Sequence, residues 1–200
     1  MNNKMLYIVL ITFLVTILLT IIIKLLKNHR LNKMLNFLNC GNFDSFDDYI
    51  NLKSNCLLFT PFNLDYIKLN SYIIRKNEKL IESSFLKFEK VKLTQFQKDD
   101  VYMKAFEYYL NVNNSNKIEY YFKLINDACS EQIKVAVARL YDVYYKKGSK
   151  FLNDLLSEID NLKGKYRASN ELLVSEIYKN LNNLEKHKYY LSLAMEHMES

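Results

Sequence analysis

Residues 109–122 (YLNVNNSNKIEYYF) align without gaps on residues 178–191 (YKNLNNLEKHKYYL), and this pair of segments decides the fold. In each segment a tyrosine stands four residues before an Asn-Asn pair, and a Tyr-Tyr pair follows the asparagines. Asparagine tolerates the left-handed backbone conformation that ends a helix, so each Asn-Asn pair predicts a tight turn between two helices. The expected structural unit is therefore a helical hairpin, and the expected fold class is all-α.

Turn residues recur along the chain at a nearly constant spacing. They stand at Gly41, Asn77, Asn113, Gly148 and Asn182, separated by 36, 36, 35 and 34 residues. Such a period is typical of a solenoid of paired helices. A second set of breaks is expected to separate one pair from the next, at Thr60-Pro61, Leu93-Thr94, Ala128 to Ser130 and Gly164-Lys165, with Pro61 at a helix start and Asn63 as a cap.

The last repeat, residues 171–198, resembles the tetratricopeptide repeat family. It has an aromatic residue before the turn, a polar pair after it and a small residue, Ala194, late in the second helix. The resemblance covers roughly residues 30–198 and implies a TPR-like α-solenoid of about four to five helix-turn-helix repeats. The family's small residue in the first helix is matched only by Ser175, since Asn70, Phe106 and Tyr141 fill that position elsewhere. This departure implies looser helix spacing and a divergent repeat.

The resemblance also implies a binding groove, because the first helices of the family line a concave face. Six residues before three of the turns stand Glu107, Asp142 and Glu176, and three residues before the same turns stand Leu110, Tyr145 and Lys179. We expect these six residues to form a partner groove that holds a peptide with basic and apolar side chains. The alternative interpretation is a charged face that contacts only solvent.

A different segment predicts a membrane anchor. Residues 5–23 (MLYIVLITFLVTILLTIII) are nineteen uncharged, almost wholly apolar residues. As a helix they span roughly 28 Å, close to the hydrocarbon thickness of a bilayer. No small-residue cleavage site follows, which argues against a signal peptide. The predicted organisation is a short tail over residues 1–4, a transmembrane helix over 5–23, a basic juxtamembrane helix over 24–40 and the repeat domain over 30–198.

Basic residues at the ends of this span predict its orientation. The membrane flank Lys24, Lys27, Arg30 and Lys33 lies on the C-terminal side, whereas Lys4 stands alone on the other. The positive-inside rule then puts the N-terminus outside and the repeat domain in the cytoplasm of a single-pass cell-membrane protein. Lipids are expected to contact residues 5–33. In the alternative topology the domain lies outside the cytoplasm as an envelope assembly or chaperone-like factor, and labelling of Cys129 by an impermeant reagent would distinguish the two.

The charge distribution argues against a nucleic-acid-binding protein. The chain has a formal net charge of +6, but residues 34–200 hold 23 basic and 22 acidic residues, so they offer no basic excess to a phosphate backbone. The three scattered cysteines, Cys40, Cys56 and Cys129, are interpreted as reduced and partly buried. Frequent Asn, Lys, Ile and Tyr suggest an AT-rich genome, such as that of a low-GC bacterium.

The sequence contains no motif that carries catalysis. The glycines are isolated, no HExxH or Cys/His ligand set is present, and His187 and His197 are ten residues apart. We therefore predict no catalytic residue, no cofactor and no metal. The leading hypothesis is a membrane-anchored, non-catalytic scaffold or adaptor that binds a protein or peptide partner through helical repeats. A membrane-bound helical enzyme and a protein that oligomerises through its span rank below it.

Overall fold

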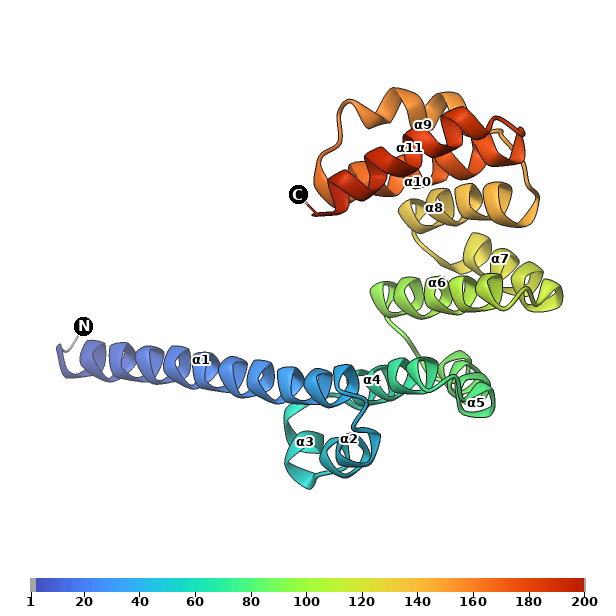
Figure 1. The fold of residues 1–200 in the computed structure, drawn as a ribbon. Helices are drawn as coiled ribbons and strands as arrows, with labels where there is room; N and C mark the ends of the chain where they lie inside the picture. The colour runs from blue at the N-terminus through green and yellow to red at the C-terminus, as the bar shows by residue number, and fades with distance from the viewer. Residues whose placement is uncertain (1–2, 200) are drawn as a thin grey trace. The chain divides into compact units, whose positions relative to one another are not determined.

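The computed structural model describes residues 3–199, and within this range the chain forms eleven α-helices, one π-helical segment and no strand (Figure 1). The predicted all-α fold class is confirmed. The elements are α1 (Asn3–Asn39), α2 (Phe43–Ile50), α3 (Lys53–Leu58), α4 (Pro61–Ile74), α5 (Glu78–Glu89), α6 (Gln95–Asn111), α7 (Ser115–Ala128), α8 (Glu131–Leu140), the π-helical segment η1 (Tyr141–Tyr145), α9 (Leu152–Ile159), α10 (Gly164–Asn180) and α11 (Leu184–Glu199).

The chain divides into two compact units. The first ends at Lys90 and contains α1 to α5, and the second begins at Val91 and contains α6 to α11. The boundary falls in the loop between the second and third predicted hairpins. The domain predicted over residues 30–198 therefore includes parts of both units, and each unit has its own buried cluster of apolar side chains.

Helix α1 is a single helix of 37 residues, as the sequence predicts for the passage from the span into the first hairpin. Asn3 and Lys4, expected in a tail, already belong to this helix, and residues 1–2 lie outside the described range. Every side chain from Val9 to His29 is exposed. Figure 1 shows this stretch standing clear of the other helices of its unit. Helix α1 is thus long and apolar enough to cross a membrane, and none of the described residues covers its stretch from Val9 to His29.

The C-terminal end of α1 packs into the core of the first unit. Met34 and Leu38 are buried, Leu31 is partly buried and Leu35 remains exposed. The remaining buried members of this cluster come from α2, from α4 and from the residue that ends α3: Phe46, Ile50, Phe59, Leu64 and Ile67. One continuous helix therefore has a bare apolar half and a half that is built into a folded core.

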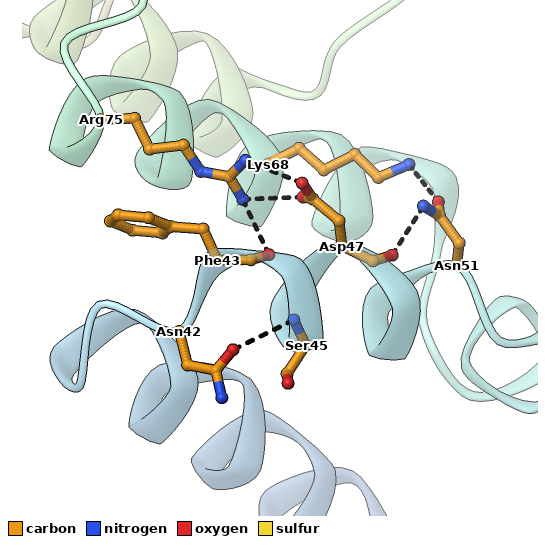
Figure 2. Close-up of polar contacts among 7 residues, drawn as sticks. All are labelled: Asn42, Phe43, Ser45, Asp47, Asn51, Lys68 and Arg75. Carbon is orange, nitrogen blue, oxygen red and sulfur yellow. Dashed lines mark hydrogen bonds and ion pairs between the residues drawn. The ribbon is translucent and has the colours of Figure 1, made fainter.

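Polar contacts join α2 to α4 within this unit (Figure 2). Arg75 Nη1 and Nη2 each donate to a carboxylate oxygen of Asp47 at 2.7 Å, and Nη2 also donates to the Phe43 carbonyl. Hydrogen bonding to Asp47 raises the pKa of the Arg75 guanidinium. Beside this pair, Lys68 Nζ donates to Asn51 Oδ1 at 2.8 Å. A two-point arginine–carboxylate contact fixes direction as well as distance, so it sets the orientation of α2 against α4.

Five residues with left-handed backbone conformation close the five hairpins. They are Gly41, Lys76, Asn113, Lys147 and Asn182, with φ between 54° and 68°. Four of the turns share two backbone hydrogen bonds of the Schellman type, for example Asn113 N to Leu110 O at 3.2 Å and Asn114 N to Tyr109 O at 3.0 Å. The predicted spacing is therefore real, but the turn residue is Lys76 where Asn77 was expected, and Lys147 where Gly148 was expected.

An asparagine follows the left-handed residue in the same four turns and caps the next helix. The side-chain oxygens of Asn42, Asn77, Asn114 and Asn183 each accept from the backbone N–H three residues later, at 3.1–3.2 Å. This satisfies one of the donors that a helix start leaves unpaired. Thr60 and Thr94 cap α4 and α6 in the same way. The expectation that Asn63 is a cap was wrong, because its backbone N–H donates to Thr60.

The two segments that align in sequence make the same aromatic contacts. Tyr109 stacks on Tyr121 with ring centroids 5.5 Å apart, and the aligned Tyr178 stacks on Tyr190 at 5.6 Å. The interplanar angles are 15° and 16°. A lysine lies over the first ring of each pair, Lys117 in one hairpin and Lys186 in the other. The stacked tyrosine joins the two helices of its hairpin, which explains its repetition.

Within the second unit each hairpin contacts the next. Helix α6 pairs with α7, and both contact α8; η1 and α9 contact α10, which pairs with α11. The first helices of these hairpins are α6, then α8 with η1, then α10, and each of them touches its neighbour. Because these three first helices lie next to one another, residues near their C-terminal ends are neighbours. The partner groove was predicted at these ends.

A substitution at a left-handed turn tests whether the hairpin turn is strained. Replacing Lys76 by glycine is expected to raise the free energy of unfolding by about 1 kcal/mol, because glycine adopts positive φ without the Cβ penalty. The matched control is Lys123→Gly, in the exposed middle of α7, where glycine costs about 1 kcal/mol. Urea unfolding followed by circular dichroism gives both values. A loss of stability in Lys76→Gly as large as that in Lys123→Gly would contradict the turn assignment.

Candidate functional site

A pocket of about 410 Å³ opens between the C-terminal ends of α6 and η1. Glu107, Leu110 and Asn111 from α6, together with Asn113 from the turn, line one side of it. Leu140, Tyr144 and Lys147 line the other side. We call this the α6–η1 pocket. It combines apolar side chains with one carboxylate, one ammonium group and two amides, so it offers contacts to a mixed apolar and charged ligand.

The two titratable side chains at the centre of the pocket are perturbed by partial burial. Glu107 is exposed as a whole, yet desolvation at the pocket wall raises the pKa of its carboxyl, while Lys104 acts in the opposite direction. Burial also raises the pKa of the Tyr144 hydroxyl, and the negative charge of Glu176 adds to this shift. Glu176, on α10, therefore acts electrostatically on Tyr144, which lines the pocket.

Four of the six predicted groove residues do not line this pocket, and the π-helical segment explains the displacement of two of them, Asp142 and Tyr145. In η1 the Lys146 N–H bonds to the Tyr141 carbonyl, five residues back, so the helix contains one extra residue before the turn. The left-handed residue is also Lys147 and not Gly148. Counted from the true turn, Tyr144 is the equivalent of Leu110, and Tyr145 is displaced from the row. Sequence spacing alone carries no signal of such an insertion.

Asp142 is engaged by the loop that follows its own helix. Its carboxylate accepts from the Lys150 backbone N–H at 3.0 Å, and its carbonyl accepts from Gly148 N at 2.8 Å. A Cβ atom at Gly148 would collide with this carboxylate, so the loop packs directly on Asp142. Tyr145 lies 5.0 Å from the ring of Tyr141 and beneath the ammonium group of Lys146. These contacts give Asp142 a loop-closing position rather than one in the pocket.

The remaining two predicted residues, Glu176 and Lys179, lie on α10, which is the first helix of the last hairpin in this unit. Glu176 and Lys179 are one turn apart on α10, and the Lys179 ammonium group contacts both carboxylate oxygens at 3.2 Å. Glu107 and Leu110 line the α6–η1 pocket, as predicted for a groove face. Whether any of these residues binds a partner stays a prediction. Of the three predicted acidic residues, Glu107 lines the pocket and Glu176 acts electrostatically on Tyr144.

The predicted membrane flank separates into two pairs of residues. Lys24 and Lys27 extend from the bare part of α1 and are exposed. Arg30 instead donates to Ser54 Oγ at 2.9 Å and to Asn55 Oδ1 at 3.0 Å, on α3. Lys33 lies 4.8 Å from the centre of the Tyr49 ring. Arg30 and Lys33 therefore hold α1 to its folded unit, in addition to any contribution to topology.

A buried polar cluster in the last hairpin was not found from the sequence. Glu171 is 0% exposed, and its carboxylate accepts from Arg167 Nε at 2.9 Å and contacts His197 Nδ1 at 2.8 Å. One turn further along α10, the buried Ser175 hydroxyl donates to the His187 carbonyl at 2.9 Å. These contacts join α10 to α11. The same hydroxyl lies 2.8 Å from His187 Nδ1, so Ser175 contacts both the backbone and the ring of His187.

The cysteines differ from the expectation that all three are partly buried. Cys40 and Cys56 are exposed, and only Cys129 is buried. Cys129 follows α7, beside Asp99, whose carboxylate accepts from Ser130 N at 3.0 Å. Burial tends to raise the pKa of Asp99, but its hydrogen bonds with Ser130 and Gln95 outweigh burial and lower it. A buried Cys129 cannot report membrane orientation, so the exposed Cys40 is the residue suited to that measurement.

Comparison with known proteins identifies no relative. No protein-family model matches the chain, and neither the curated proteins nor the solved structures contain a significant match. Among the described residues, no group of three or more His, Cys, Asp or Glu side chains is arranged to hold a metal ion. The absence of a metal or cofactor in the functional protein stays a prediction.

Thiol labelling tests the environment of Cys129. Burial first, and the neighbouring Asp99 second, raise the pKa of its thiol to about 12 from an ordinary value of 9.0. At neutral pH we expect a maleimide to label Cys40 and Cys56 quickly and Cys129 only after denaturation. The stabilisation from the neutral thiol is complete below pH 9.0 and is lost as the pH rises towards about 12. Rapid labelling of three thiols in the folded protein would contradict this packing.

Proposed function

We propose that this protein is a membrane-anchored, non-catalytic adaptor, in which TPR-like helical hairpins bind a protein or peptide partner at the membrane. The observation that carries the proposal is α1. Within its stretch of 31 residues from Val9 to Asn39, an 18-residue window has a mean hydropathy of 2.8 and no buried side chain. Soluble monomers rarely expose an apolar surface of this extent, and a bilayer is the environment that such a helix matches in both length and composition.

The second unit supplies the binding part of the proposal. Its three hairpins contact one another in sequence order, as the repeats of a solenoid do. Their first helices bring Glu107, Leu110 and Tyr144 into one pocket. The partner with matching chemistry is a segment with apolar side chains and a basic residue, because Glu107 adds a carboxylate to the pocket wall and Glu176 brings negative charge to Tyr144. Lys147 at the rim selects against partners with adjacent positive charges.

The anchor and the pocket have separable roles in this proposal. Anchoring raises the local concentration of the adaptor at the bilayer, and the pocket selects the partner. The orientation with the folded units in the cytoplasm follows from Lys24 and Lys27, which remain available beside the span, and it is part of the proposal.

Truncation tests the anchor. A chain that lacks residues 1–26 is expected to leave the membrane fraction and to keep its helical content, because the removed residues make no core contact in the described range. Removing residues 1–33, which include all of the residues expected to contact lipids, is expected to lower the stability of the first unit, since Arg30 and Leu31 pack there. Membrane fractionation and thermal unfolding measure the two effects. If the chain that lacks residues 1–26 stays in the membrane fraction, α1 is not the anchor.

A charge reversal tests the pocket. In native membranes, Glu107→Lys is expected to reduce crosslinked partner about tenfold, a loss of about 1.4 kcal/mol, because it replaces the attractive carboxylate at the pocket wall with a repulsive ammonium group. Tyr144→Ala is expected to do the same through lost apolar contact.

The matched control for this experiment is Glu196→Lys, which makes the same charge change on the exposed side of α11. It should leave partner recovery unchanged. Equal recovery from the Glu107 and Glu196 variants would show that the pocket is not the binding surface.

A further inference from the structure

The most exposed large apolar side chain of the described residues lies on α3, close to the place where α1 leaves its bare stretch. Leu57 is 88% exposed, and Leu52, just before this helix, is 44% exposed. Cys56 and Lys53 are also exposed. No acidic residue occurs between Asn51 and Leu64. This combination of exposed leucines with a lysine and no carboxylate is unusual for a surface that contacts only water, and it is typical of elements that lie in a membrane interface.

The structure fixes α3 at a defined level along α1. Arg30 donates to Ser54 and Asn55, the first half of α3, whereas Met34 and Leu38, further along α1, pack in the core with α2. Asn55 is itself buried, and its side-chain amide donates to the carbonyl of Tyr49 on α2. Helix α3 is therefore hydrogen-bonded to both α1 and α2. Figure 1 shows α3 at the end of this small bundle that faces back along α1 towards the N-terminus.

The level of α3 coincides with the expected headgroup layer. Within the bare stretch of α1 from Val9 to His29, the last exposed apolar side chains are Leu25 and Leu26, and Arg30 follows Leu26 by four residues, which is about 6 Å along a helix. Counted from Ile23, the distance is about 10 Å. Side chains of a helix lean towards its N-terminus, so the Arg30 guanidinium lies nearer the span than its backbone does. The headgroup region on each side of a bilayer is about 5–8 Å thick.

We propose that α3 is an interfacial membrane-binding element, which inserts Leu57 and Leu52 among lipid headgroups while Lys53 meets anionic lipid phosphates. This inference rests on the proposed function, because it requires α1 to be inserted as a span. The rigid passage of α1 into the first unit then brings the exposed face of α3 to the bilayer surface. The element gives the first unit a second contact with the membrane, so the unit does not rotate freely about the end of the span.

The test measures the polarity around single labelled cysteines in the full-length protein. Vesicles contain equal parts of phosphatidylcholine and phosphatidylglycerol, and the label is an environment-sensitive fluorophore attached by a maleimide. Cys129 stays unlabelled because it is buried. With Cys40 and Cys56 replaced by serine, Leu57→Cys reports on α3 and Leu18→Cys reports on the span. The native Cys40, retained alone, reports on a site fourteen residues beyond Leu26, about 21 Å along the helix.

We expect the label at residue 57 to emit at shorter wavelength than the label at Cys40 and to be several-fold less quenched by aqueous iodide. The label at residue 18 should be the most protected. If residue 18 is protected but residue 57 is quenched as strongly as Cys40, α3 lies in water and this inference is wrong. If residue 18 is also quenched, α1 is not a span, and the proposed function fails together with the inference.

A second variant separates insertion from an effect of the label itself. Here Cys56 carries the label, Cys40 is replaced by serine, and Leu57 is changed to glutamate. Because Leu57 is exposed, this change leaves the folded core intact. The Cys56 label is expected to become several-fold more accessible to iodide than in the chain with Leu57, since a charged residue withdraws α3 from the headgroups. Unchanged quenching would contradict insertion through Leu57.

Discussion

The constraint on which the rest of this structure depends is the turn that closes each helical hairpin. At Gly41, Lys76, Asn113 and Asn182 one residue takes a left-handed conformation, two backbone hydrogen bonds end the first helix, and the following asparagine caps the second. These local bonds fix where each helix stops and where its partner starts, within a few residues. The tyrosine stacking in the third and fifth hairpins then sets which faces of the two helices meet.

The fourth hairpin departs from this pattern, and the departure shapes the candidate site. Its first helix contains a π-helical turn, its left-handed residue is Lys147, and no asparagine follows. The extra residue turns Asp142 towards its own loop and Tyr144 towards α6. The pocket thus arises where the repeat is irregular. π-Helical insertions are frequent at functional sites, and an irregular repeat also breaks the equivalence of neighbouring hairpins, so that one position differs from the rest.

Helix α1 combines two environments in one rigid element. Its first part presents bare apolar side chains, and its last part contributes Met34 and Leu38 to a protein core. Because no loop separates the two parts, the first unit inherits the position of the span. The hydrogen bonds of Arg30 with α3 lie at this junction. Arg30, which the positive-inside rule counts as a topology signal, therefore also stabilises the fold. In the proposed function, such a helix positions the folded unit as well as retaining it at the membrane.

The sequence by itself determined the helical fold class, the apolar helix and the hairpin period, because each depends on local chemistry: apolar length, left-handed turn residues and side-chain caps. It also located Glu107 and Leu110 on a pocket-facing helix. Only the tertiary structure decided that Asp142 and Tyr145 leave that row, that Arg30 binds α3, and that Glu171 is buried with Arg167 and His197. These features depend on one inserted residue or on contacts between separate helices. Neither of these produces a periodic pattern in the amino-acid sequence.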